Sequence, residues 1–156
     1  MTLLPERIDN FYDGRKSALW LFGLIVFLRT AMSVNSILKG DRVARFADGV
    51  ALDSFTPAGA HSFLALFAVV GFANLVICFL CLLALVLYRA MVPLMFAVLL
   101  LEQIGRRTIL YVMPIARTGK PPGLAINLAL IGLTGVGLVL SLSKRPGDAG
   151  GERNRR

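Results

Sequence analysis

Residues 91–113 read MVPLMFAVLLLEQIGRRTILYVM, an apolar stretch that the polar hexapeptide Glu102 to Arg107 interrupts. A helix needs about 20 residues to cross about 30 Å of hydrocarbon, so neither apolar flank spans alone, whereas the whole stretch spans as one helix. Glu102, Arg106 and Arg107 then lie at membrane depth, where charged side chains are costly and mark a structural or functional site. The stretch therefore predicts a membrane helix with a polar centre.

The free-energy balance indicates that this helix needs partners. Its three charges cost about 2.5–3.5 kcal/mol each near the bilayer centre. Its eleven Leu, Ile, Val and Phe residues return only about 0.3–0.6 kcal/mol each. Insertion of the isolated helix is therefore marginal or unfavourable, and we expect other helices to supply polar side chains at the same depth.

The composition indicates a single integral membrane domain over residues 1–143. The chain has 156 residues, of which 56% are hydrophobic, whereas a soluble domain has about 45–50% apolar residues. A soluble domain of this size has too much surface to bury such an excess. The first apolar run begins near Ala18 and is too long for the core of a cleavable signal peptide.

Four segments are long enough to span a bilayer, and they predict an all-α membrane protein that forms a four-transmembrane-helix bundle. The spans cover about residues 18–38, 63–87, 91–113 and 124–142. Thr56 followed by Pro57 is typical of a helix N-terminus, so the second helix is predicted to run over 57–88. Tyr88 to Ala90 then form a tight turn. Residues 144–156 are predicted to be a disordered, basic cytoplasmic tail.

The first external loop carries a helical pattern of apolar residues. Val43, Phe46, Ala47 and Val50 recur at i, i+3, i+4 and i+7, which predicts a short helix on the membrane interface. The Asp48-Gly49 pair is expected to end it.

The distribution of Lys and Arg predicts the orientation. One side holds nine of them: Arg7, Arg15, Lys16, Arg89, Lys144, Arg145, Arg153, Arg155 and Arg156. The other side holds five: Lys39, Arg42, Arg45, Arg117 and Lys120. The positive-inside rule places both termini in the cytoplasm of a cytoplasmic (inner) membrane. The net charge of +8 is explained by this bias and by anionic membrane lipids, so nucleic acid is not expected as a partner.

Polar residues of three spans converge near the midplane. Counting along alternating helices brings together Arg29, Asn74 and Glu102, and the residues beside Glu102 complete an intramembrane polar cluster of Arg29, Asn74, Glu102, Gln103, Arg106 and Arg107. Three interpretations stay open: a structural lock between helices, a site for an anion or lipid headgroup that arginines bind, and a proton or ion relay. The surplus of positive charge supports the second, and the first two are compatible.

The cysteines and the histidine form no motif that predicts a redox, haem-binding, catalytic or metal-binding site. Cys78 and Cys81 form a CxxC motif, but a mid-helix position in lipid disfavours thiolates, so packing is expected over a redox role. His61 is the single histidine, which excludes bis-His haem ligation within the chain. No catalytic or metal-binding spacing is present. We expect no cofactor and no metal, and an enzyme is disfavoured.

Ala125, Ala129 and Gly132 form a small-residue stripe that favours close helix packing, within the bundle or between subunits of a homo-oligomer. In the order of its elements (span, interfacial loop, long span, tight turn, two spans) the chain resembles the DoxX-like small membrane proteins. The resemblance is one of layout, and it assigns no residue a role.

These features predict a small, non-enzymatic accessory or binding protein whose Arg/Glu cluster locks the bundle and receives an anionic ligand or lipid headgroup. Membrane lipids are the expected partners, with a larger membrane protein as a further one. The first alternative is a small transporter or channel component that uses the same cluster, and the second is a redox accessory that acts through Cys78 and Cys81. A re-entrant hairpin over residues 91–115 is the alternative topology.

Overall fold

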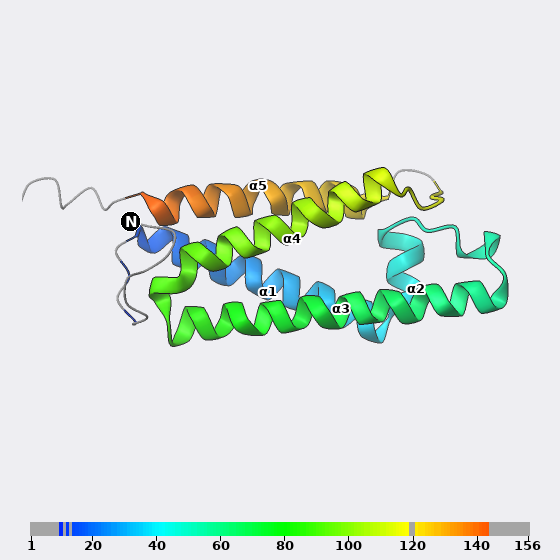
Figure 1. The fold of residues 1–156 in the computed structure, drawn as a ribbon, viewed down its shortest axis with the longest axis horizontal. Helices are drawn as coiled ribbons and strands as arrows, with labels where there is room; N and C mark the ends of the chain where they lie inside the picture. Colours follow the sequence, from blue (N-terminus) through cyan, green and yellow to red (C-terminus); the bar gives the residue numbers. More distant parts are fainter. Residues whose placement is uncertain (1–9, 11, 13, 119–120, 144–156) are drawn as a thin grey trace, which may run out of the picture.

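The computed structural model describes residues 10, 12, 14–118 and 121–143. In this part of the chain, four helices of more than 20 residues lie side by side and alternate in direction (Figure 1). They are α1 (Lys16–Leu38), α3 (Pro57–Val86), α4 (Val92–Val112) and α5 (Pro122–Leu142). We call the end with the α3–α4 connection the turn end, and the opposite end, with the α4–α5 connection, the loop end.

Three of these helices, α1, α3 and α5, are long and apolar enough to cross a membrane. The chain is therefore an all-helical protein with three candidate membrane-spanning helices. The helix α4 has sufficient length at 21 residues, but Glu102, Arg106 and Arg107 lower its hydropathy. The predicted count of four transmembrane helices is thus not confirmed. The helix α4 runs without a break through the polar hexapeptide, whereas the hairpin alternative requires a break there.

Local sequence signals explain where α3 begins and ends. The hydroxyl of Thr56 accepts a hydrogen bond from the backbone N–H of Gly59 at 3.2 Å, and Pro57 occupies the first helical position. This is the predicted N-cap. At the other end, a 3-10 turn over Arg89–Met91 connects α3 to α4, so the predicted tight turn is confirmed.

The first loop is helical over eight residues, as α2 (Gly40–Arg42) and a π-helical turn, η1 (Val43–Ala47), and a 3-10 turn, η2 (Leu52–Ser54), follows. The predicted short helix is thus present as a π-helical turn, and its position at a membrane interface is not confirmed. Within it Ala44 is buried and Phe46 is 74% exposed. Gly49 ends the segment with φ +67°, a conformation that favours glycine.

At the loop end, backbone hydrogen bonds join the connection between α1 and α3 to the connection between α4 and α5. The N–H of Thr118 donates to the carbonyl of Gly49 at 2.8 Å, and the N–H of Ala51 donates to Ala116 at 3.3 Å. Gly123, in the first turn of α5, lies so close to η1 that an added Cβ would be 2.5 Å from the carbonyl oxygen of Ala47. The η1 segment is therefore fixed against the start of α5.

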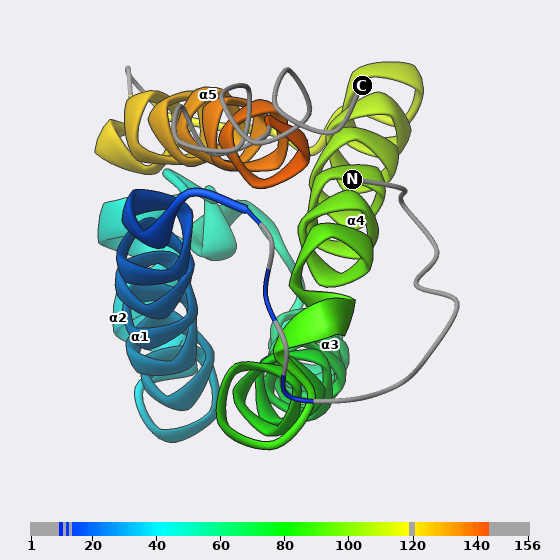
Figure 2. The same cartoon turned by 90° about the vertical axis from the view of Figure 1, so that its left-hand side faces the viewer.

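Apolar side chains fill the turn end of the bundle, which Figure 2 shows end-on with α1, α3, α4 and α5 around a common centre. The rings of Phe22 and Phe96 meet edge to face, with centroids 4.8 Å apart. Phe96 lies against Gly137, where an added Cβ would be 2.3 Å from its ring. The buried core comprises Ala18, Phe22, Ile25, Val26, Cys78, Cys81, Val92, Phe96 and Leu99. All belong to the turn-end halves of their helices.

Candidate functional site

A polar layer crosses the bundle directly beyond this core. The Nη2 of Arg29 on α1 donates to the Oδ1 of Asn74 on α3 at 2.9 Å, and it also donates to a carboxylate oxygen of Glu102 on α4 in an ion pair. Arg29 is 5% exposed. The structure thus brings together the three residues that were predicted to meet near the midplane.

A second contact connects the layer to α5. The side-chain amide of Gln103 donates to the hydroxyl of Thr134 at 3.1 Å, and this hydroxyl donates to the carbonyl of Leu130 at 2.6 Å. Both Gln103 and Thr134 are buried. Sequence reasoning missed Thr134, although a hydroxyl in the middle of the last apolar span was a usable signal. The layer therefore connects all four long helices.

The two arginines of the hexapeptide behave differently. The Nε of Arg106 lies 3.5 Å from the second carboxylate oxygen of Glu102, so Glu102 lies between two guanidinium groups. Arg107, one residue further on, has no ion pair with any residue that the structure describes. Arg106 is therefore joined to the predicted cluster by an ion pair, and the place of Arg107 in it stays a prediction.

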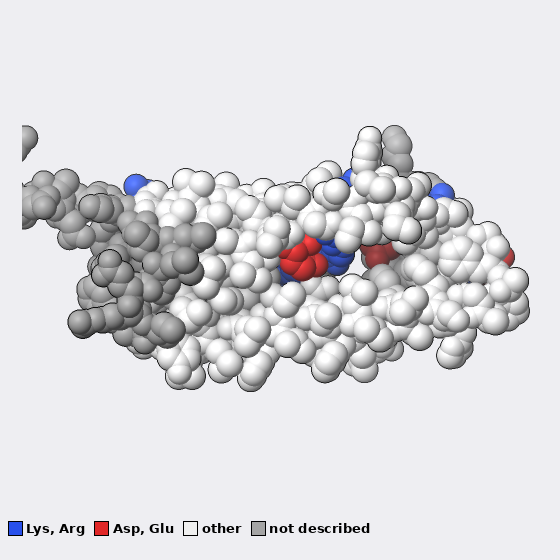
Figure 3. Space-filling view, viewed as in Figure 1, with Lys and Arg blue, Asp and Glu red and all other residues white. Residues whose placement is uncertain are grey.

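A cavity of about 420 Å³ lies on the loop-end side of the polar layer, between α1, α3, α4, α5 and η1. This volume is within the range of about 300–1,000 Å³ that is typical of small-molecule sites. Its polar walls are formed by Arg29, Ser33, Asn74, Gln103, Arg106 and Asn127. In Figure 3, charged atoms are visible in a hollow on the side of the bundle, between α4 above and α3 below. The cavity therefore combines a buried charged wall with access from the side.

Arg29 has unused hydrogen-bonding capacity at this cavity. Its Nη2 bonds both Asn74 and Glu102, but its Nη1 is buried without a hydrogen-bond partner among the described residues. A buried, unpaired donor of a charged group costs several kcal/mol, and native proteins rarely retain one without a function. A ligand with an acceptor oxygen would satisfy it.

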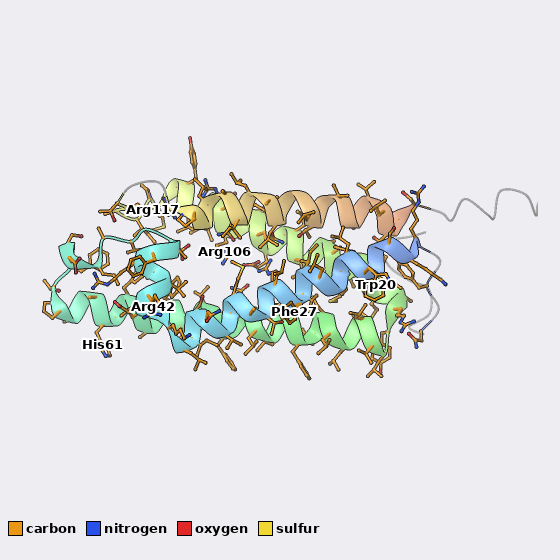
Figure 4. All side chains as sticks on the ribbon, turned by 180° about the vertical axis from the view of Figure 1, so that it is seen from behind. Trp20, Phe27, Arg42, His61, Arg106 and Arg117 are labelled. Carbon is orange, nitrogen blue, oxygen red and sulfur yellow. The ribbon has the colours of Figure 1, made fainter. Side chains whose placement is uncertain are left out.

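Asp48, which follows η1, adds a carboxylate to the cavity wall. Burial raises the pKa of this carboxyl above its usual value, while the nearby positive charges of Arg106 and Arg117 act in the opposite direction. Figure 4 shows Arg106 near the middle of the bundle and Arg117 at the loop end. Sequence reasoning treated Asp48 only as a helix terminator, and its position depends on the packing of η1 against α5.

The other candidate residues lie away from the polar layer. Cys78 and Cys81 are buried in the apolar core as free thiols, which is the position expected for packing residues. His61 is exposed near the start of α3 (Figure 4). Among the residues that the structure describes, no three His, Cys, Asp or Glu side chains are grouped so as to hold a metal ion.

Three apolar helices of membrane-spanning length and a charged layer between them define this chain as a helical membrane protein with an internal polar site. No family model, curated protein or solved structure matches it. Its function is therefore inferred from the site alone.

Proposed function

We propose that this chain is a small accessory or binding protein of the cytoplasmic membrane, without enzymatic activity, whose Arg/Glu cluster locks the bundle and binds an anionic group. The observation that carries the proposal is that Arg29 lines a cavity of about 420 Å³, while its buried Nη1 has no hydrogen-bond partner among the residues that the structure describes. The anionic group is a phosphate or carboxylate, from a free ion or a lipid headgroup, because guanidinium groups bind both through paired hydrogen bonds.

The topology that we propose has four transmembrane helices, with both termini in the cytoplasm and η1 at the opposite interface. The polar side chains of α4 support the fourth span, because Glu102 is paired and Gln103 is buried and bonded. On its outer face, α4 presents apolar side chains such as Leu101 and Ile109, which are 73% and 61% exposed. Such a face suits lipid contact. A reporter fused after Lys144 tests this topology, and a reporter signal from the outside would refute it.

The lock and the binding site share Arg29 but use different nitrogens. The Nη2 bonds within the layer, and the Nη1 remains for a ligand. Arg106 is 37% exposed at its side chain and lines the same cavity. At the polar layer, the two guanidinium groups against the carboxylate of Glu102 leave one positive charge, which favours an anionic group at this end of the cavity, whereas Asp48 lines the cavity further towards the loop end.

The test uses Arg106→Gln, because this change removes a cavity charge and leaves the Arg29–Glu102 pair in place. We expect the purified variant to bind phosphatidylglycerol or inorganic phosphate about tenfold more weakly than the wild type, since a hydrogen bond to a charged group is worth about 1.5–3 kcal/mol. Arg107→Gln is the matched control. Equal binding by wild type and Arg106→Gln would refute the proposal.

The same contacts bear on the two alternative functions. A transporter that uses this cavity needs a path through the turn end, which the Phe22 and Phe96 rings fill. A redox role needs accessible thiols, whereas the side chains of Cys78 and Cys81 are buried in that core. The contacts therefore support a binding role more directly than either alternative. A larger membrane protein or a second copy at the stripe of Ala125, Ala129 and Gly132 remains a proposed partner.

A further inference from the structure

The cavity carries charges of both signs at different positions along the bundle. Arg29 and Arg106 lie on the walls that α1 and α4 provide, and Asp48 lies where η1 meets the start of α5. Asp48 forms no ion pair with any residue in the described part of the chain. Arg29 and Arg106 therefore place positive charge at the polar layer, and Asp48, on which the charges of Arg106 and Arg117 also act, places a carboxylate towards the loop end.

Close packing of η1 against α5 positions Asp48. A Cβ added to Gly123 would lie 2.5 Å from the carbonyl oxygen of Ala47 and 3.0 Å from the Oδ1 of Asp48, so both residues lie directly against this glycine. On the opposite wall, Arg29 is held by Asn74 and Glu102. A ligand with only negative charge would meet the carboxylate of Asp48 as well as the arginines, and like charges in such a site repel.

The remaining wall is apolar, and the hollow opens on the side of the bundle. The apolar lining residues are contributed by α1, α3, α5 and η1, and they include Leu28, Met32, Phe67, Val70, Ile126 and Leu130. The helix α4 contributes Gln103 and Arg106 to the lining. The hollow lies between α3 and α4 (Figure 3), and it would face the hydrocarbon of a bilayer if both helices span. Hydrocarbon chains can occupy such an exit, whereas a small soluble ion makes no use of it.

Resting on the proposed function, we infer that the ligand is a phospholipid with a zwitterionic headgroup. Its phosphate bonds Arg29 and Arg106, and its ammonium group pairs with Asp48. Its acyl chains leave the bundle between α3 and α4. Charge of both signs and a side opening that Phe67 and Val70 of α3 line on one side together favour this ligand over an anionic lipid or a free phosphate.

The experiment measures lipid binding to the delipidated full chain in detergent by native mass spectrometry. The probes are phosphatidylethanolamine, phosphatidylglycerol and soluble phosphoethanolamine. We expect the wild type to prefer phosphatidylethanolamine. We expect Asp48→Asn to raise the dissociation constant for this lipid about tenfold, which corresponds to the loss of one hydrogen bond between charged groups. Binding of phosphatidylglycerol to Asp48→Asn should stay equal or increase.

Asp53→Asn is the matched control, because Asp53 is an exposed loop carboxylate that pairs with Arg45 and does not line this cavity. It should leave the lipid preference unchanged. A thermal midpoint of Asp48→Asn at or above that of the wild type excludes misfolding as the cause of lost binding.

The other outcomes separate this inference from the proposed function. Stronger binding of phosphatidylglycerol than of phosphatidylethanolamine, unchanged in Asp48→Asn, would overturn the zwitterionic ligand and retain an anion site. Phosphoethanolamine binding as strongly as the lipid would overturn the role of the acyl chains. If none of the three probes binds, both the inference and the proposed function fail.

Discussion

Removing Glu102 should destabilise the protein much more than removing Glu102 and Arg29 together. In Glu102→Leu, the buried guanidinium of Arg29 keeps only the neutral Asn74 as a partner. In the double variant Arg29→Met/Glu102→Leu, no charge is left buried without a counter-charge, and both helices gain apolar surface. The prediction is therefore a large, favourable coupling between the two substitutions.

The expected magnitude follows from burial. Removing one partner of a buried ion pair costs about 3–5 kcal/mol, and Arg29 is 5% exposed, so Glu102→Leu should be in this range. Arg29→Met should cost about 2–4 kcal/mol, because Asn74 loses its donor while Glu102 retains Arg106 at 3.5 Å. The double variant should lose only about 1–3 kcal/mol, for the unpaired oxygen of Asn74. The coupling is then at least about 2 kcal/mol.

The assay is reversible unfolding from detergent micelles with increasing denaturing detergent, followed by far-ultraviolet circular dichroism. A parallel cycle of Glu102→Leu with Arg107→Leu serves as the control, since Arg107 has no ion pair with a described residue. Its coupling should be close to zero. If the Arg29 and Glu102 effects add to within about 0.5 kcal/mol, the two side chains do not act as a buried pair and the reasoning is refuted.

Three further changes test the contacts around this layer. Thr134→Val should lower the unfolding free energy by about 1–3 kcal/mol in the same assay, because the buried amide of Gln103 loses its acceptor; Thr134→Ser should retain stability. Gly137→Ala should lower the unfolding free energy by about 1–3 kcal/mol, because the new Cβ would lie 2.3 Å from the ring of Phe96. Gly135→Ala should be neutral, because its Cβ meets no atom within 4 Å. Equal effects of the two changes would contradict the packing of Phe96 against Gly137. Burial raises the pKa of Asp48, so its folded carboxyl binds protons more tightly than the unfolded one, and stability is lost as pH rises above about 3.9. Asp48→Asn should therefore raise the thermal midpoint of the lipid-free protein at pH 7, and the difference from the wild type should disappear in acid. A difference that does not change with pH would contradict the raised pKa of Asp48.

The position of each polar residue along its helix axis could be predicted from the sequence. The side of the helix that faces the bundle could not. Counting residues along alternating helices placed Arg29, Asn74 and Glu102 at one level, and the structure joins all three. Depth depends only on helix rise, which is constant. The same counting included Arg107, which forms no ion pair with the described residues, because rotation of α4 about its axis depends on packing.

The contacts that the sequence did not predict all depend on how two elements approach each other. Thr134 joins the layer only because α5 packs against α4 at Gln103. Asp48 reaches the cavity only because η1 lies against Gly123.

The position of the cavity beside the polar layer makes the lock and the site one energetic unit. Arg29 forms the ion pair through Nη2, and its buried Nη1 has no partner among the described residues. An oxygen acceptor on a bound ligand would therefore remove the free-energy cost of this unpaired donor. A ligand present at 100 times its dissociation constant adds about 2.7 kcal/mol to stability, which is comparable to the loss expected when one side chain of the layer is removed. On the proposed function, a bound lipid would therefore act as a further member of the layer, and the stability of the bundle would report on the occupancy of the site.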